Sequence, residues 1–449
     1  MRIIQRADEE TLRLLNAQSK AAGELRSMKY CVQLSVDEGT LLFNNITKEL
    51  LLLEKDACTD FFVSSYAQEH WFSVPEQTDE QQCIHMLRKA FYPGPTDIAQ
   101  HKDLLYLIYT TTCCNARCPY CYEIGHHNNV TMSKETAEKT ADFIMARTRP
   151  EQMIVLEWMG GEPLLNTKAM DVICERIHSA GRSYCSRIAT NGYMFTDEMI
   201  KKAKELWQLK VAQITLDGLE EEYNATKRYT DKSAKTESPF RRVLNNVEKL
   251  LNIGIGIEIH LHITEHNGDD MLALIAYLFS RFGPRRNLKI AVSTYLERIF
   301  DDINRRGDDA EKAILSKQIE ALELIRRFGY QKSDWRTKLR STHCNPDANR
   351  QLNVLPDGKI GWCDQVIDRD YLGTVDSQEL DVQMIEKYRE RMEDLPECAD
   401  CPHYPDCIRL KGCFRDVTWC TSEFRQLKEY KLQTAILQTY RRSQLVAPK

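Results

Sequence analysis

The stretch "LLYLIYTTTCCNARCPYC" (104–121) joins an apolar run to a cluster of cysteines. The run at 104–110 has the length and the apolar, aromatic composition of a buried strand. Cys114, Cys118 and Cys121 follow in the order C-x3-C-x2-C, in the loop directly after this strand. Disulfides, zinc sites and iron–sulfur clusters all use clustered cysteines, so the rest of the chain must discriminate among them.

Length and composition are those of an ordinary globular protein. The chain has 449 residues, 42% of them apolar and 28% charged, which suits about three domains. The formal net charge of -5 gives no reason to expect nucleic acid or an acidic membrane as a partner. The first residues, "MRIIQRADEETLRLL", contain no apolar signal region, and no stretch approaches the roughly 18 apolar residues of a membrane span. The sequence predicts a cytoplasmic protein.

The 16 cysteines favour metal or redox chemistry, because disulfides are rare in a reducing compartment. Most of them fall into two groups with definite spacing. The remainder are predicted to be small buried side chains outside both groups: Cys31, Cys58, Cys83, Cys113, Cys174 and Cys185.

Apolar strand candidates alternate with amphipathic helices after residue 104. The strands are expected at 104–110, 153–160, 186–192, 211–218, 255–263 and 287–295. One of the helices, 238–254, has Ser238 as its cap, Pro239 in its first turn and Gly254 at its end. Such repeats predict a parallel α/β sheet, open or curled into a barrel, with the chemistry at the carboxyl ends of the strands.

The remaining segments complete a five-part domain prediction. Residues 28–55 are expected to form a small sheet, and 78–94 a helix whose apolar stripe includes Ile84 and Leu87. A charged helical connection follows the barrel, then a cysteine-, proline- and aspartate-rich region, then a last amphipathic helix. The predicted domains are 1–100, 101–300, 301–340, 341–425 and 426–449.

Three cysteine ligands leave a four-iron cluster one ligand short, so one iron stays open to a small molecule. Zinc would also require a fourth protein ligand, which His126 or His127 could supply. Spacing alone leaves both possibilities open.

The segment "CNARCPYC", with the aromatic Tyr120 before its last cysteine, resembles the radical S-adenosylmethionine (SAM) superfamily. The resemblance implies a partial (β/α)6 barrel with a [4Fe–4S] cluster on Cys114, Cys118 and Cys121. It also implies that SAM chelates the open iron, and that reductive cleavage of SAM releases a 5′-deoxyadenosyl radical. The electron would come from a donor such as flavodoxin or ferredoxin. Cys113 lies outside the pattern.

Further motifs at the next strand ends resemble the SAM site of this superfamily. "GGEP" (160–163) ends the second strand, "TNG" (190–192) the third and "TLDG" (215–218) the fourth. The candidate SAM contacts implied are Tyr120, Gly160, Gly161, Glu162, Asn191, Thr215 and Asp217, with Lys227 or Arg228 for the SAM carboxylate and His262 on the fifth strand. His260 and His262 point to the same side of that strand. Each of these residues also has a plain structural interpretation, as a strand-end polar group closing a turn or a histidine of the core.

A second cysteine group comprises Cys344, Cys363, Cys398, Cys401, Cys407, Cys413 and Cys420. By itself it is compatible with structural zinc. After a radical SAM domain it resembles the SPASM extension, which carries two auxiliary [4Fe–4S] clusters. That resemblance implies one cluster on Cys398, Cys401, Cys407 and Cys420, and the other on Cys344, Cys363 and Cys413. Seven cysteines are one short of eight, so one iron stays open or His343 completes the set. The five-residue gap between Cys407 and Cys413 departs from the usual three.

The front section, about 1–100, resembles the winged-helix-like domain that recognises leader peptides, with "GTLLFNNITKELLLLE" (39–54) as its wing. Such domains add the leader as a strand to their sheet; the alternative is a purely packing role. The leading hypothesis is therefore a maturase that installs thioether, or else carbon–carbon, crosslinks in a ribosomally made precursor peptide. The alternatives are an anaerobic sulfatase-maturating enzyme, which forms formylglycine, and a non-catalytic iron–sulfur redox sensor.

Overall fold

The computed structural model describes residues 1–18, 23–55, 58–92, 104–121, 129–231, 234, 236–264, 266–294, 309–330, 335–411, 413 and 420–446. The chain forms two compact units. The larger unit contains residues 94–332 and 349–387, and the smaller contains 1–93, 333–348 and 388–449. The five consecutive domains expected from the sequence remain a prediction. None of the described helices combines the length and apolar character needed to cross a membrane.

A nine-stranded sheet, ordered β12-β11-β10-β9-β8-β7-β13-β14-β15, is the centre of the larger unit. Its strands are β7 (Leu105–Tyr109), β8 (Ile154–Met159), β9 (Tyr184–Thr190), β10 (Leu209–Leu216), β11 (Gly256–Ile263), β12 (Leu288–Thr294), β13 (Gln351–Val354), β14 (Lys359–Gly361) and β15 (Gly373–Thr374). Strands β7 to β12 pair in parallel in chain order, and β13 pairs in parallel with β7. This confirms the partial (β/α)6 barrel and all six predicted strands.

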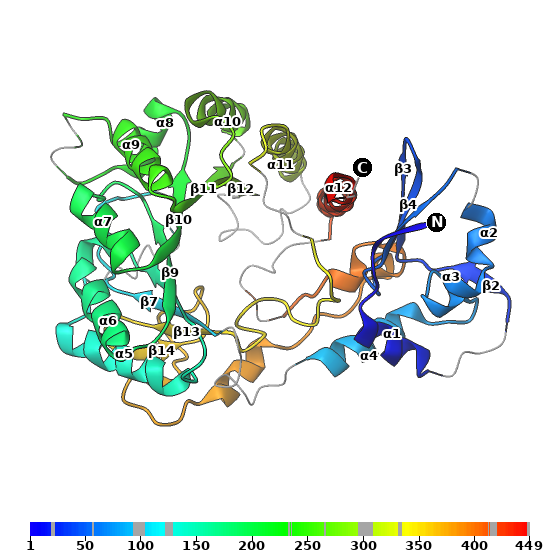
Figure 1. The fold of residues 1–449 in the computed structure, drawn as a ribbon. Helices are drawn as coiled ribbons and strands as arrows, with labels where there is room; N and C mark the ends of the chain where they lie inside the picture. Colours follow the sequence, from blue (N-terminus) through cyan, green and yellow to red (C-terminus); the bar gives the residue numbers. More distant parts are fainter. Residues whose placement is uncertain are drawn as a thin grey trace. The chain divides into compact units, whose positions relative to one another are not determined.

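Helices cover one face of this sheet (Figure 1). They are α5 (Lys134–Arg147), α6 (Thr167–Ser179), α7 (Asp197–Glu205), α8 (Glu220–Lys227), α9 (Pro239–Asn252), α10 (Gly268–Phe282) and α11 (Asp309–Arg327), with 3-10 turns η2 (Pro163–Asn166) and η5 (Val382–Tyr388). Helix α9 begins as predicted, since the Ser238 hydroxyl accepts the backbone N–H of Arg241 at 3.4 Å and Pro239 occupies its first turn.

Alternation along the strands separates the two faces of the sheet. In β8, Ile154, Leu156 and Trp158 are fully buried, whereas Glu157 and Met159, at alternate positions, are half-buried. Because strand side chains alternate, the first set packs under the helices and the second faces the barrel interior. His260 and His262 of β11 both occupy half-buried positions on the interior side of their strand, the same side for both, as predicted.

The smaller unit contains a four-stranded antiparallel sheet, ordered β1-β5-β4-β3. Its elements are β1 (Arg2–Gln5), α1 (Glu9–Asn16), β2 (Leu25–Ser27), β3 (Cys31–Val36), β4 (Gly39–Asn44), β5 (Leu50–Leu53), α2 (Cys58–Phe62), α3 (Ser65–Glu69), β6 (Ser73–Pro75), α4 (Glu80–Phe91), η6 (Pro396–Asp400), η7 (Tyr404–Asp406) and α12 (Ser422–Val446). Ile84 and Leu87 of α4 are fully buried, as the predicted stripe requires. Ile436 and Tyr440 of α12 pack against Leu41, Phe43 and Leu50 of the sheet, so the end of the chain belongs to the same core as its beginning.

Candidate active site

The loop after β7 carries the first cysteine group. The backbone N–H of Ala116 donates to the sulfur of Cys114 at 3.4 Å. Burial is the main cause that raises the pKa of the Cys114 thiol to about 12; the Ala116 N–H opposes the rise, and Glu162, Cys118 and Cys121 add to it. The three thiols are therefore electrostatic neighbours in one loop at the carboxyl edge of the sheet.

Two glycines at the end of β8 let the next strand end approach this loop. A Cβ on Gly160, whose φ is +137°, would meet the Thr111 carbonyl oxygen at 2.3 Å. A Cβ on Gly161 would meet the Cys113 carbonyl oxygen at 2.4 Å. Instead the Gly161 N–H donates to the Thr111 carbonyl at 3.0 Å. Any side chain here would push the two loops apart, so the sequence requires glycine at both positions.

Glu162 links three strand ends from a fully buried position. Its backbone N–H donates to the Cys113 carbonyl at 2.8 Å. Its carboxylate accepts the Thr190 hydroxyl at 2.7 Å and the Asn191 backbone N–H at 2.9 Å. Burial raises the pKa of Glu162, and these hydrogen bonds oppose that rise. The carboxylate thus fixes the end of β9 beside the cysteine loop.

The end of β10 is joined to the cysteine loop by a buried ion pair. The Lys227 ammonium lies 3.0 Å from Asp217, and the two side chains are only 4% and 5% exposed. The Tyr120 hydroxyl donates to Asp217 at 2.6 Å and accepts from Lys227 at 2.8 Å. Burial alone would lower the pKa of Lys227, but Asp217 and Tyr120 raise it well above its ordinary value. The amine is therefore a cation whose charge Asp217 already balances.

The histidines of β11 lie toward the same interior. The rings of His262 and Tyr120 meet edge to face, with centroids 5.4 Å apart. Burial lowers the pKa of His262 to about 4, which keeps the ring neutral at physiological pH. His260 lies directly across from Thr215 in the register of β10 and β11, and its ring contacts Glu258 at 3.0 Å.

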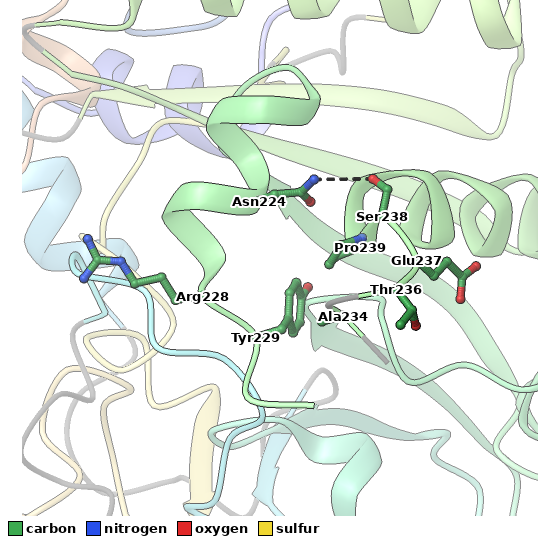
Figure 2. Close-up of a pocket in the computed structure, with 8 residues that line it drawn as sticks. All are labelled: Asn224, Arg228, Tyr229, Ala234, Thr236, Glu237, Ser238 and Pro239. Atoms are coloured by element: carbon green, nitrogen blue, oxygen red, sulfur yellow. Dashed lines mark hydrogen bonds between the residues drawn. The ribbon is translucent and has the colours of Figure 1, made fainter. Parts of the chain in front are cut away.

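Arg228 is exposed, whereas its neighbour Lys227 is buried. It ends α8 in the left-handed conformation with φ 49°, and its side chain is exposed. It contributes to a pocket of about 310 Å³ lined also by Tyr229, Glu237 and Ser238, where Asn224 donates to the Ser238 hydroxyl (Figure 2). In that view the guanidinium points away from the other lining residues.

Asn115 belongs to the site although its residue type gave no signal in the sequence. Its side-chain oxygen accepts from Asn191 at 2.7 Å, and its backbone carbonyl accepts the Thr230 N–H at 2.9 Å. The side chain is 8% exposed, yet within the described residues its Nδ2 donor has no hydrogen-bond partner. A buried N–H without an acceptor is costly, so this position suits a bound oxygen atom. The one sequence signal for Asn115 is its position between Cys114 and Cys118.

The residues of the cysteine loop fit the [4Fe–4S] cluster and the SAM molecule that the sequence implies. The thiols are neighbours, one already accepts a backbone N–H as cluster ligands do, and an unused amide donor lies beside them. In the part of the chain that the structure describes, no three His, Cys, Asp or Glu side chains converge on one point where a single metal ion would bind. His126 and His127, the ligands of the zinc alternative, lie outside the described residues.

The second cysteine group is divided between the units. In the smaller unit, burial raises the pKa of Cys407, and Cys398 and Cys401 raise it further. Cys420 acts in the same direction on Cys398 and on Cys401. The pKa of Cys344 is raised to about 11, mainly by burial and to a smaller extent by Cys413. The Cys413 sulfur lies 3.7 Å from the Nε2 atom of His343.

Cys363 lies in the larger unit, so the predicted set of Cys344, Cys363 and Cys413 stays a prediction. Of the cysteines predicted to be buried bystanders, Cys83 and Cys174 are buried. Cys31, Cys113 and Cys185 are half-buried, and the side chain of Cys58 is outside the described part.

Comparison with known proteins agrees with this geometry. Residues 108–278 match the family model of the radical SAM superfamily. The GTP 3′,8-cyclase of Clostridium perfringens (strain SM101 / Type A) is 30% identical over 181 residues, which are 39% of this chain and 51% of that protein. The chain thus spans about half the length of the curated relatives it matches.

Among solved structures, native anSMEcpe with bound AdoMet and Cp18Cys peptide is similar with a TM-score of 0.57 and 15% identity, over 77% of this chain and 99% of that one. Streptococcus suis SuiB bound to S-adenosylmethionine has a TM-score of 0.47 and 11% identity, over 86% and 94% of the two chains. The family match and the shared fold establish that the chain contains a radical SAM domain.

Proposed function

We propose that this chain is a radical SAM enzyme that installs a thioether, or else a carbon–carbon, crosslink in a ribosomally made precursor peptide. The observation that carries the radical SAM part is the hydrogen-bonded network around the cysteine loop. It joins the loop to Glu162, Asn191 and Asp217 from three successive strand ends. A redox sensor would have no use for this arrangement, which suits a second ligand beside the cluster.

Cys114, Cys118 and Cys121 would hold the [4Fe–4S] cluster. When bound, the cluster and SAM supply the 5′-deoxyadenosyl radical, which removes a hydrogen atom from the substrate. Gly160 and Gly161 have no side chains and so let the end of β8 lie against the cysteine loop, where SAM would bind. Because Asp217 already balances Lys227, we assign the SAM carboxylate to the exposed Arg228, whose fork of donors suits a carboxylate.

Asn191 and Thr215 are the proposed polar contacts to SAM from β9 and β10. Asn115 is added to them, because its amide donor is buried and has no partner in the described residues. Tyr120 and His262 would form one wall of the pocket. Their edge-to-face contact and the neutral state of the imidazole favour a role in packing rather than in charge.

The sheet of the smaller unit supports the part of the proposal that concerns a peptide substrate. Its sheet ends on β3, and within the described residues no strand pairs with the outer edge of β3. A free edge of this kind takes up an extended peptide as an added strand. We propose that this edge recruits the leader, and that auxiliary clusters on the second cysteine group accept the electron released when the crosslink forms.

Mass spectrometry tests the proposal. The reconstituted enzyme is incubated anaerobically with SAM, reductant and the short peptides encoded beside its gene. A product lighter by two hydrogens per event, with a cysteine that no longer alkylates, supports a thioether. The same loss with every thiol still alkylatable means a carbon–carbon bond. Unchanged peptides alongside normal 5′-deoxyadenosine formation would overturn the peptide-maturase proposal and direct the search to sulfatase-type substrates.

A further inference from the structure

The hairpin turn between β4 and β5 is buried over its whole length. All six residues of this buried turn, 44–49, are at most 1% exposed, although they include a lysine and a glutamate. Hairpin turns ordinarily lie at the surface, because their backbone polar groups need water. Here the Asn44 side chain accepts the backbone N–H groups of Ile46 and Thr47 at 2.9 and 3.0 Å and replaces that water.

Residues 398–407, which we call the cysteine segment, cover this turn. The Lys48 ammonium lies 2.8 Å from the Asp406 carboxylate, and the two side chains are 1% and 10% exposed. Asn45 donates to the Pro402 carbonyl at 2.7 Å. Lys48 also adopts a φ of 63°, a left-handed conformation that is strained for a lysine. A buried charge and a strained backbone persist together only where the surrounding contacts require them.

Helix α4 contacts the same segment on both sides of Asp406. The Arg88 guanidinium donates to the carbonyls of Tyr404, Pro405 and Cys407 at 2.6, 3.2 and 2.8 Å. Its carbon also lies 5.0 Å from the centroid of the Tyr404 ring. All three bonds come from one guanidinium nitrogen, Nη2, so the three carbonyls turn toward a single point and the backbone conformation at Cys407 is fixed.

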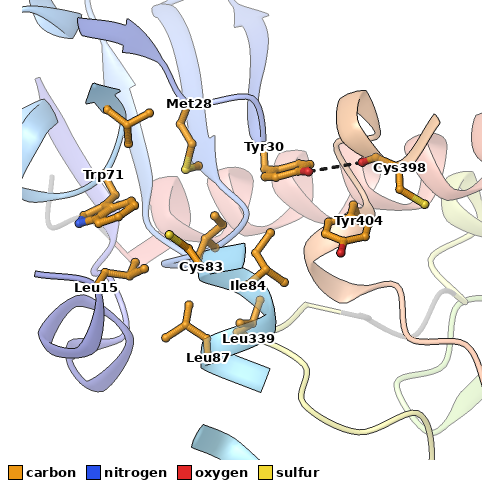
Figure 3. Packing of buried hydrophobic residues seen from close by; sticks show 12 residues of the cluster. Leu15, Met28, Tyr30, Trp71, Cys83, Ile84, Leu87, Leu339, Cys398 and Tyr404 are labelled. Atoms are coloured by element: carbon orange, nitrogen blue, oxygen red, sulfur yellow. Dashed lines mark hydrogen bonds between the residues drawn. The ribbon is translucent and has the colours of Figure 1, made fainter. Parts of the chain in front are cut away.

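Two residues of the segment enter the hydrophobic core of the N-terminal elements (Figure 3). Cys398 and Tyr404 lie in one buried cluster with Tyr30, Ile84 and Leu87. The Tyr30 and Tyr404 rings stack with centroids 5.5 Å apart, and the Tyr30 hydroxyl donates to the Cys398 carbonyl at 3.4 Å. The cysteine segment and the N-terminal domain therefore share one core.

We propose that the buried turn and Arg88 position Cys398, Cys401 and Cys407 for an auxiliary iron–sulfur cluster, and that cluster loading and folding of the N-terminal sheet stabilise one another. The inference rests on the auxiliary cluster of the proposed function. Its physical basis is linkage: a cluster that binds only the ordered segment stabilises everything that orders the segment. The leader-binding sheet would then be fully stable only in cluster-loaded enzyme.

Iron retention by full-length variants tests the positioning. All chains carry Cys114→Ala, Cys118→Ala and Cys121→Ala, so that iron and labile sulfide after anaerobic reconstitution report the second cysteine group alone. Lys48→Met and Arg88→Met are each expected to weaken retention against a chelator by about 10–100-fold, as is usual for residues that orient metal ligands.

The matched controls are adjacent residues. Glu49→Gln changes an equally buried residue of the same turn, whose carboxylate contacts Tyr66 and His70 instead of the cysteine segment. Lys89→Met changes the exposed residue next to Arg88. Both controls should retain iron as the parent chain does. If Lys48→Met fails to fold, Lys48→Met/Asp406→Asn removes both buried charges, and Arg88→Lys keeps the charge without the guanidinium group.

Hydrogen exchange measures the coupling itself. In the parent chain, amides of β4 and β5 should exchange at least about tenfold more slowly after cluster loading, whereas Arg88→Met should lose this difference. A merely structural role would lower protection with and without cluster alike and would overturn the proposal, as would equal iron retention in Lys48→Met and Glu49→Gln. No iron in the parent chain would instead overturn the auxiliary cluster of the proposed function.

Discussion

Substituting Lys227→Met isolates the buried ion pair that joins β10 to the cysteine loop. Methionine fills a similar volume, so the main effect is to leave the Asp217 carboxylate buried without its cation, while the Tyr120 hydroxyl still donates to it. Removing one partner of a buried pair costs about 3–5 kcal/mol. The same substitution at Lys201, whose partner Glu205 lies 3.9 Å away with both side chains mostly exposed, should cost at most about 1 kcal/mol.

Thermal unfolding of the cluster-free chain measures this difference. A domain of this size loses roughly 2–4 °C of melting temperature per kcal/mol, so a loss of about 3–5 kcal/mol in Lys227→Met should lower the transition of the larger unit by about 6–20 °C. Two units can unfold separately. Hydrogen exchange of the β7 and β10 amides therefore assigns the transition.

Two further results decide the interpretation. Lys227→Met/Asp217→Asn removes both charges and leaves Tyr120 an acceptor, so it should recover part of the lost stability. Because the Tyr120 hydroxyl loses the Lys227 donor, Lys227→Met should also weaken iron retention at Cys118 and Cys121 by about 10–100-fold. If Lys227→Met and Lys201→Met melt at the same temperature, breaking the buried Lys227–Asp217 pair costs no more than breaking an exposed pair, and the reasoning fails.

Three other predictions concern the cofactor sites. Alanine at Cys114, Cys118 or Cys121 should abolish 5′-deoxyadenosine formation, measured by chromatography, whereas Cys113→Ala should retain it. Gly161→Ala would place a Cβ 2.4 Å from the Cys113 carbonyl and should lower SAM affinity at equilibrium; Gly361→Ala, where the nearest atom is at 3.5 Å, should not. Alanine at Cys344 or Cys363 should spare SAM cleavage but stop product formation in the peptide assay, and product from either variant would contradict their role in an auxiliary cluster.

The barrel could be predicted because its signals are local. Strands β8, β9 and β11 alternate buried side chains with half-buried interior ones, and Ser238 and Pro239 mark the start of α9 within a few residues. Parallel strands in chain order bring their carboxyl ends together. The sequence alone therefore indicates that the motifs at successive strand ends form one site. It does not indicate which of their atoms are in contact.

The buried contacts could not be predicted, because they join residues that are distant in the chain. Lys48 and Asp406 are 358 positions apart, and "NNITKE" has the composition of an exposed turn. Lys227 and Arg228 are adjacent cations that the sequence could not distinguish. Only the packing of α8 against the cysteine loop makes one a buried partner of Asp217 and leaves the other exposed.

The order of the segments has a consequence for assembly. The smaller unit is built from three stretches of chain, and about 240 residues of the larger unit separate the first from the second. Closing a disordered loop ten times longer costs about 2 kcal/mol more, so the smaller unit gains when the intervening barrel is already folded. The Lys48–Asp406 pair and the core around Tyr30 and Tyr404 should therefore form last. Because the proposed leader-binding sheet shares that core, a chain with an incomplete barrel would present no stable edge to a precursor peptide.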